Sequence, residues 1–542
     1  MNSTDKQFTE NSNTSSWKSN LLKTAALFNN KRQEIFHSYI LPYKWEYFFG
    51  GIFILLILFS ELYFDFFATY RAALSFWYAL FEGHPLSFYS YAKFIPGATL
   101  NRMIADGAGY DFTIYAFFAI WNFPAWLYEK LSGNYAESCF LCLAWAKLML
   151  PTFVIMTARG MKKILEFIIG NDRDSATMVY AYSFSGILIV SVYLIGQYDI
   201  ICALFCVYGL YYFLTKDYRR FYLFFGVALT CKNFAVFVFI CLILLHEKRF
   251  LYIIRNFIGG CYLVIIEKLL FSFGKSYESI HSVSLTTNKA EITPITLVTY
   301  HFKNILHLKT YMGNGVMSTL LFLFALIWIY CYLQKREETR HFYYKVIYIA
   351  FCINLVFVLY AASHLYWFIL LLPYMILMIY IRSDNRKINL LLETVGTGSL
   401  IVWRFSFDPH FFTSNNFDSM LIYHLLGKPY YYQEGIFAAI GAMSAEGGSL
   451  FSPFNLIRSI FYICMLLLLI INFPAFVKES SFTDSPEEVG IRGLLTFRTV
   501  CVIGVLLLPL IAYTTQVIFH DSLSNFQTGN QLLNEIIPYL LR

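Results

Sequence analysis

Long apolar runs separated by short polar turns follow one another along most of this chain. About 20 predominantly apolar residues in a helix span the hydrocarbon core of a bilayer. By that criterion we expect spans near 48–66, 138–157, 176–196, 199–215, 219–232, 233–246, 251–271, 313–333, 343–361, 365–381, 388–404, 454–475 and 497–516. The predicted fold class is an all-α polytopic membrane protein with about 11–13 transmembrane helices. The runs 219–232 and 233–246 are short, which predicts tilted or broken helices.

Lysine and arginine are concentrated in alternate turns, which orients the predicted spans because cytoplasmic loops carry an excess of these residues. The five basic turns hold Arg159, Lys162 and Lys163; Lys216, Arg219 and Arg220; Lys248 and Arg249; Lys335, Arg336 and Arg340; and Arg382, Arg386 and Lys387. The polar N-terminal segment, 1–45, is then cytoplasmic, and the long loops 67–137, 272–312 and 405–453 face outward. We expect one transmembrane catalytic region over 46–405, followed over 406–542 by the last loop, the last helices and the tail.

One further apolar segment, 114–131, is long enough to span but would invert every later loop if it did. Trp121, Pro124 and Trp126 lie within it. Tryptophan favours the headgroup region, and proline interrupts a helix. We therefore expect interfacial helices in the first outer loop rather than another span.

The composition agrees with a membrane protein and argues against several soluble classes. Hydrophobic residues make up 58% of the chain and charged residues only 14%, against about 25% charged residues in soluble domains. The net charge of +7 resides in turns between spans, so it does not indicate nucleic-acid binding. The sequence contains no GxxxxGK[ST] loop, which disfavours an ATP-driven transporter, and no HExxH or GxSxG motif.

The tripeptide Gln197-Tyr198-Asp199 lies between two long apolar runs. An ionised aspartate costs about 2.5–3.5 kcal/mol at the bilayer centre. A carboxylate at or just inside a membrane boundary is therefore usually paired or functional. Asp199, with Gln197 and Tyr198 beside it, is therefore a candidate functional residue. The alternative is an aspartate that caps the following helix from the interface.

The first outer loop contains Asp106, Tyr110 and Asp111, with glycines on both sides of Ala108. Because glycine permits tight turns, both carboxylates can point the same way. A carboxylate beside a hydroxyl nucleophile can act as general base, or it can hold a divalent ion such as Mg²⁺ or Mn²⁺ against a phosphate. The alternatives are solvated turn residues, or a helix cap in the case of Asp111.

Three cationic side chains lie close to the same predicted outer plane: Lys232, His364 and Arg404. Each could hold the phosphate of a substrate, and His364 could also act as acid or base. The alternatives are snorkelling of Lys232, a helix-end histidine in the headgroup zone, and an interfacial anchor at Arg404.

The order of these features resembles the GT-C superfamily of polytopic glycosyltransferases over roughly residues 45–405. The likeness lies in the acidic first loop, the Gly196–Asp199 segment, the Lys232-Asn233-Phe234 motif and the segment from His364 to Pro373. It implies a GT-C-like helical bundle that takes a sugar from a polyprenyl-phosphate donor and transfers it to a glycan acceptor, with inversion. The two acids are five residues apart, unlike the Asp-x-Asp form of some relatives, which leaves metal dependence open.

The resemblance further implies that Asp111 or Asp106 is the base, that Asp199 orients the acceptor or binds a metal, and that Lys232, His364 and Arg404 surround the donor phosphate. Gln197, Tyr198 and Tyr110 are then expected to contact substrate. Three other classes stay open: a flippase or transporter of lipid-linked glycans, an envelope glycan polymerase of the O-antigen ligase type, and a non-enzymatic scaffold. The large loop at 405–453 keeps the polymerase open, and Asp199 would be unexplained in a scaffold. We expect a multi-pass protein of the cell membrane, preferably the bacterial inner membrane, whose site faces outward.

Overall fold

The computed structural model describes residues 43–93, 110–170, 172–273, 310–312, 315–317, 319–360, 365–407, 417–419, 453–482, 491–504 and 507. Within these ranges the chain is mainly helical, as the apolar runs predict. Asp106, His364 and the first 42 residues lie outside the described ranges, as does the side chain of Arg404. The predictions that concern them stay predictions.

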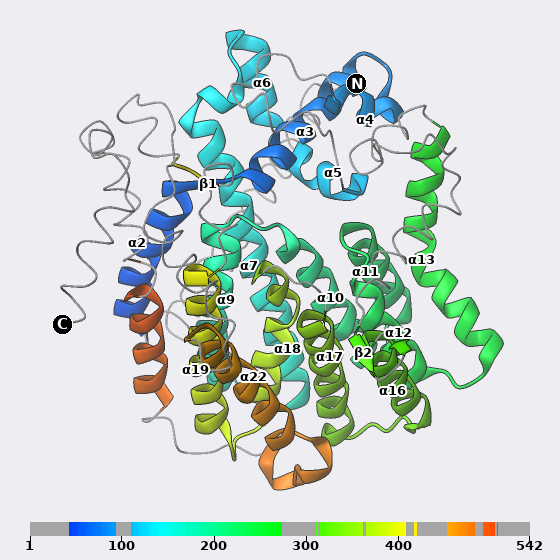
Figure 1. Ribbon diagram of the computed structural model, residues 1–542. Coiled ribbons are helices and arrows are strands. Elements are labelled where there is room, and N and C mark those ends of the chain that lie inside the picture. The colour runs from blue at the N-terminus through cyan, green and yellow to red at the C-terminus, as the bar shows by residue number, and fades with distance from the viewer. Residues whose placement is uncertain are drawn as a thin grey trace, which may run out of the picture.

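Helices from both halves of the chain form a bundle (Figure 1). Its elements are α2 (Lys44–Ser60), α7 (Phe140–Ile168), α8 (Asp172–Ser183), α9 (Gly186–Leu188), the π-helical η5 (Ile189–Leu194), α10 (Asp199–Leu214), α11 (Tyr218–Cys231), α12 (Ala235–His246), α13 (Phe250–Phe273), α16 (Thr319–Leu333), α17 (Arg340–Tyr360), η6 (Leu365–Leu370), α18 (Leu372–Ile381), α19 (Arg386–Phe407), α22 (Pro453–Ile471) and a helix over 491–504. The short helices η7 (Pro474–Phe476) and η8 (Glu479–Phe482) follow α22.

Three described helices are long and apolar enough to cross a membrane: Phe140–Ile168, Phe250–Phe271 and Arg340–Leu359. The pair Asp174–Ser183 and Gly186–Leu194, bent by 40°, is a fourth if it forms one span. Other predicted spans correspond to shorter helices, such as the 12-residue α12. The membrane-protein class is thus supported at this level, while the larger number of crossings stays a prediction.

A layer of helices lies across one end of the bundle (Figure 1). This cap layer consists of α3 (Phe64–Phe81), η3 (Pro85–Ser87), α4 (Phe88–Lys93), α5 (Phe112–Trp121), α6 (Phe123–Ser132) and η4 (Ala136–Ser138). The apolar segment 114–131 therefore forms parts of two ten-residue helices, and Pro124 lies in the first turn of the second. Ten helical residues extend only about 15 Å, too short to cross a bilayer.

The first predicted span, 48–66, is wrong at its end. Helix α2 stops at Ser60, the strand β1 (Glu61–Tyr63) follows, and α3 begins at Phe64. β1 pairs antiparallel with β4 (Phe417–Ser419), with Leu62 opposite Asp418. A second short hairpin joins β2 (Thr310–Met312) to β3 (Gly315–Met317). Hydropathy does not reveal the break between α2 and α3, because both helices are apolar.

Several of the predicted basic turns meet at the other end of the bundle. Lys216 forms an ion pair with Glu338, and Arg336 donates to the hydroxyl of Tyr218. Lys248 Nζ donates to the carbonyl of Cys331 at 2.9 Å. The turns that follow α10, α12 and α16 therefore lie together, which agrees with their predicted location on one side.

Candidate functional site

Asp199 lies at a break in the helical chain, where η5 ends at Leu194 and α10 begins. Gly196 makes the break possible, because its φ of +77° is rarely adopted by other residues and a Cβ there would lie 3.3 Å from Phe66. Asp199 is 0% exposed. Tyr198 is the N-cap residue of α10, and no side chain caps it, so the structure does not support the capping alternative for Asp199.

Lys232 is the partner of Asp199, and its Nζ lies 3.2 Å from Asp199 Oδ1. Lys232 is the C-cap residue of α11, in extended conformation. Because its ammonium group meets a carboxylate that is 0% exposed, the side chain does not snorkel. Neither carboxylate oxygen of Asp199 has a hydrogen bond of good geometry among the described residues, and neither does Gln197 Oε1. Buried oxygens without such bonds are costly unless a ligand or water serves them.

Tyr110, two residues before α5, lies against this pair. Its hydroxyl donates to Asp65 Oδ2 at 3.0 Å, and its ring centroid lies 4.9 Å from Lys232 Nζ. The ring also packs edge-on against Tyr198, with the centroids 5.3 Å apart. Burial, assisted by the negative charge of Asp65, raises the pKa of Tyr110 well above its ordinary value, so the phenol stays protonated and keeps donating.

Asp65 is the residue that sequence reasoning missed. It lies in the first turn of α3, and it accepts hydrogen bonds from Tyr110 and from Gln197 Nε2, the latter at 3.2 Å. Unlike Asp199, it is partly exposed. The available signal was an acidic residue in the last turn of the predicted span 48–66, at its outer end.

Asp111 follows Tyr110 but turns toward a different partner. Its carboxylate pairs with Lys268 of α13, and it makes no capping hydrogen bond although it is the N-cap residue of α5. The adjacent residue of α13, Glu267, accepts from the backbone and hydroxyl of Thr113 at 3.2 and 2.7 Å. Asp65, Tyr110, Gln197, Tyr198, Asp199 and Lys232 thus form a polar cluster. Asp111 borders this cluster.

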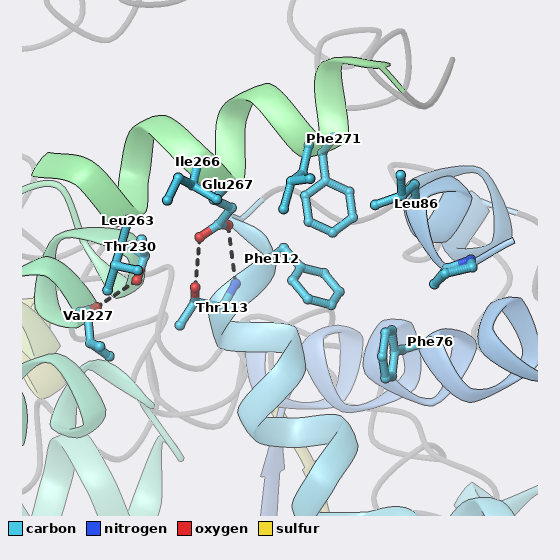
Figure 2. A pocket seen from close by; sticks show the side chains of 12 residues that line it. Phe76, Leu86, Phe112, Thr113, Val227, Thr230, Leu263, Ile266, Glu267 and Phe271 are labelled. Carbon is cyan, nitrogen blue, oxygen red and sulfur yellow. Dashed lines mark hydrogen bonds between the residues drawn. The ribbon is translucent and has the colours of Figure 1, made fainter. Parts of the chain in front are cut away.

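A cavity of about 320 Å³ lies between the cap layer and helices α11 and α13. Figure 2 shows aromatic and aliphatic side chains around it, among them Phe76, Phe112 and Phe271. Thr230 and the Thr113–Glu267 pair supply its polar groups. Thr230 is two residues before Lys232, so this largely apolar space adjoins a chain segment of the polar cluster.

Among the residues that the structure describes, no three His, Cys, Asp or Glu side chains are placed to hold a metal ion. Of the predicted site residues, Gln197, Tyr198, Asp199, Lys232 and Tyr110 come together, with Asp111 at their border. No model of a known protein family matches this sequence. No significantly similar curated protein is found either. The geometry of the cluster therefore carries the functional argument.

Proposed function

We propose that this protein is a GT-C-like membrane glycosyltransferase, which moves a sugar from a polyprenyl-phosphate donor to a glycan acceptor with inversion. One observation carries the proposal: a buried Asp199–Lys232 pair lies at a helix break, beside the partly exposed Asp65. The carboxylate oxygens of Asp199 make no hydrogen bond of good geometry among the described residues. Such an arrangement supplies a cation and a carboxylate to a phosphate-bearing substrate. Polar groups at membrane depth are typically functional.

In this proposal Asp65 takes the proton of the acceptor hydroxyl, in place of Asp111 or Asp106, because it is the cluster carboxylate that solvent reaches. The hydroxyl attacks the anomeric carbon, and the bond to the donor phosphate breaks. Lys232 stabilises the charge that develops on the leaving phosphate. His364 and Arg404 remain proposed contacts of that phosphate, and a divalent ion remains open.

The apolar cavity favours a donor that carries a lipid chain. A hydrocarbon chain would lie against Phe76, Phe112 and Phe271, in a cavity that Thr230, two residues before Lys232, also lines. Burial of hydrocarbon gains about 25 cal/mol per Å². We propose that the site lies on the outer face of a cell membrane, because the cluster and the basic turns lie at opposite ends of α10. The bacterial inner membrane stays our preferred location.

The test uses the full chain in nanodiscs and synthetic polyprenyl-phosphate hexoses, with lipid-linked glycans as acceptors. Release of prenyl phosphate in a single turnover should fall by about 10²–10⁴-fold in Asp65→Asn. Asp217→Asn is the matched control, since Asp217 caps α11 at the basic end and asparagine caps equally well. Absence of turnover with all donors in the unmodified protein would contradict the proposal.

The O-antigen ligase type remains the second candidate, for a specific reason. β4 belongs to the late loop at 405–453 and pairs with β1, whose last residue is two positions before Asp65. The late loop therefore reaches the neighbourhood of the site. Full activity in Asp65→Asn, with loss of activity on substitution of His410 or His424 in that loop, would favour this candidate.

A further inference from the structure

Helix α13 is lightly packed. Only 11% of its most apolar stretch is buried, and it stands at the edge of the bundle (Figure 1). Its main close approach is to α11, where a Cβ on Gly226 would lie 3.2 Å from the carbonyl oxygen of Gly260. The contacts near its C-terminal end, at Glu267 and Lys268, therefore matter more than they would in a buried helix.

At the start of α5, side chains of α13 take the place of the usual N-cap interaction. The first N–H groups of a helix lack intrahelical acceptors, and the N-cap side chain usually supplies one. At α5 the N-cap residue Asp111 pairs instead with Lys268, and Glu267 accepts from the backbone N–H and hydroxyl of Thr113. Figure 2 shows Glu267 directed at Thr113 along the edge of the cavity. Two adjacent residues of α13 thus fasten the start of α5.

Tyr110 immediately precedes this fastened segment. Its hydroxyl reaches Asp65 and its ring lies against Lys232. We propose that Glu267 and Lys268 are positioning residues, which hold Tyr110 between Asp65 and Lys232 from a helix outside the cluster. Neither residue reaches the reacting atoms, and Lys268, unlike Glu267, does not line the cavity assigned to the lipid chain. The consequence for catalysis rests on the proposed function, whereas the effect on Tyr110 does not.

The first measurement needs no substrate. Hydroxyl-radical labelling of Tyr110, read by mass spectrometry, should rise several-fold in Glu267→Ala and in Lys268→Met. Tyr380, 0% exposed in α18, should stay unlabelled if the fold is intact. The exchange Asp111→Lys with Lys268→Asp should return Tyr110 labelling toward its original value. Glu166→Ala, which removes a partly exposed pair with Lys162 on α7, is the matched control.

The second measurement concerns turnover. Loss of positioning should lower kcat by about 10²-fold. In Lys268→Met, whose changed side chain does not line the cavity, the KM for the donor should change little. In a Tyr110→Phe background the same Glu267→Ala change should cost much less, because the two residues act in series. Should Glu267→Ala fail to fold, Glu267→Gln and Lys268→Met decide instead. Unchanged Tyr110 labelling in folded variants would overturn the inference, whereas increased labelling without donor turnover in the unmodified protein would overturn only the proposed function.

Discussion

Lys232 Nζ, just after the end of α11, lies 3.2 Å from Asp199 Oδ1, at the start of α10. Both helices pack together, so the residue that follows one helix faces the first residue of the other. The aspartate is fully buried and the lysine side chain is 12% exposed. A desolvated pair of this kind stabilises a fold only modestly, because desolvation offsets most of the attraction.

Breaking this pair from one side should be costly. Asp199→Asn or Lys232→Gln should each lower the free energy of unfolding by about 3–5 kcal/mol, because an unpaired buried charge is left behind. The double variant should regain most of that stability and none of the turnover. Denaturant unfolding and single-turnover rates at matched amounts of folded protein check both parts. Near-normal turnover in the double variant would remove the pair from the chemistry.

Tyr110→Phe isolates one hydrogen bond. The variant keeps the ring beside Lys232 but removes the donor to Asp65. We expect stability to fall by about 1.5–3 kcal/mol, the range for hydrogen bonds to charged groups. Turnover should fall as well, because Asp65 loses one of its two fixed donors. If unfolding and turnover were both unchanged, Tyr110 would have no part in holding Asp65.

Gly196→Ala should disturb the helix break. A left-handed conformation costs a non-glycine residue about 1–2 kcal/mol, and the new Cβ would press on Phe66 at 3.3 Å. Gly51→Ala is the control, since a Cβ there meets nothing within 4 Å, and alanine within a helix gains about 0.5–1 kcal/mol. The two substitutions should therefore change the unfolding free energy in opposite directions. A stabilised Gly196→Ala would be incompatible with the described break.

The cap layer contains a buried ion-pair network around Arg71. The stability lost when Arg71 is removed should depend on pH. Arg71 pairs with Glu129 and lies 3.3 Å from Glu137. Burial raises the pKa of Glu137 from its ordinary 4.5, and Arg71 partly opposes that rise. Removing Arg71 should raise the pKa further. A carboxyl with a raised folded-state pKa loses stability as pH climbs above its unfolded value, so Arg71→Met should be more destabilising at neutral pH than near pH 4.5. Thermal unfolding at both values checks the sign, and an equal loss would contradict it.

Labelling can test the predicted orientation. Asn134, in the cap layer, and Glu337, at the basic end, are both exposed. In a cysteine-free background, a membrane-impermeant thiol reagent added outside should modify Asn134→Cys and spare Glu337→Cys until the membrane is opened. Modification of Glu337→Cys from outside would place the cluster on the cytoplasmic face.

Much of the bundle follows from the sequence because apolar runs and basic turns report local chain properties. The runs anticipate α10 and α17 within a few residues, and the cost of a buried charge singles out Asp199. The start of α7 is also anticipated, but that helix continues to Ile168 and contains Arg159, Lys162 and Lys163, which were predicted to lie in a turn. Asp65 escaped because an apolar stretch that turns at Ser60 looks the same as one that continues. The Asp111–Lys268 pair escaped because its members are 157 residues apart, and no local pattern encodes that contact.

The antiparallel pairing of β1 with β4 has a consequence for biosynthesis. Tyr63 pairs with Phe417. Ribosomes add about 5–20 residues per second, so roughly 18–71 s separate the synthesis of these two positions. Before that interval ends the nascent chain already carries Asp65, Asp199 and Lys232, while β1 still presents an unpaired edge. A ribosome that stalls before codon 417 leaves that edge open to other chains in the membrane.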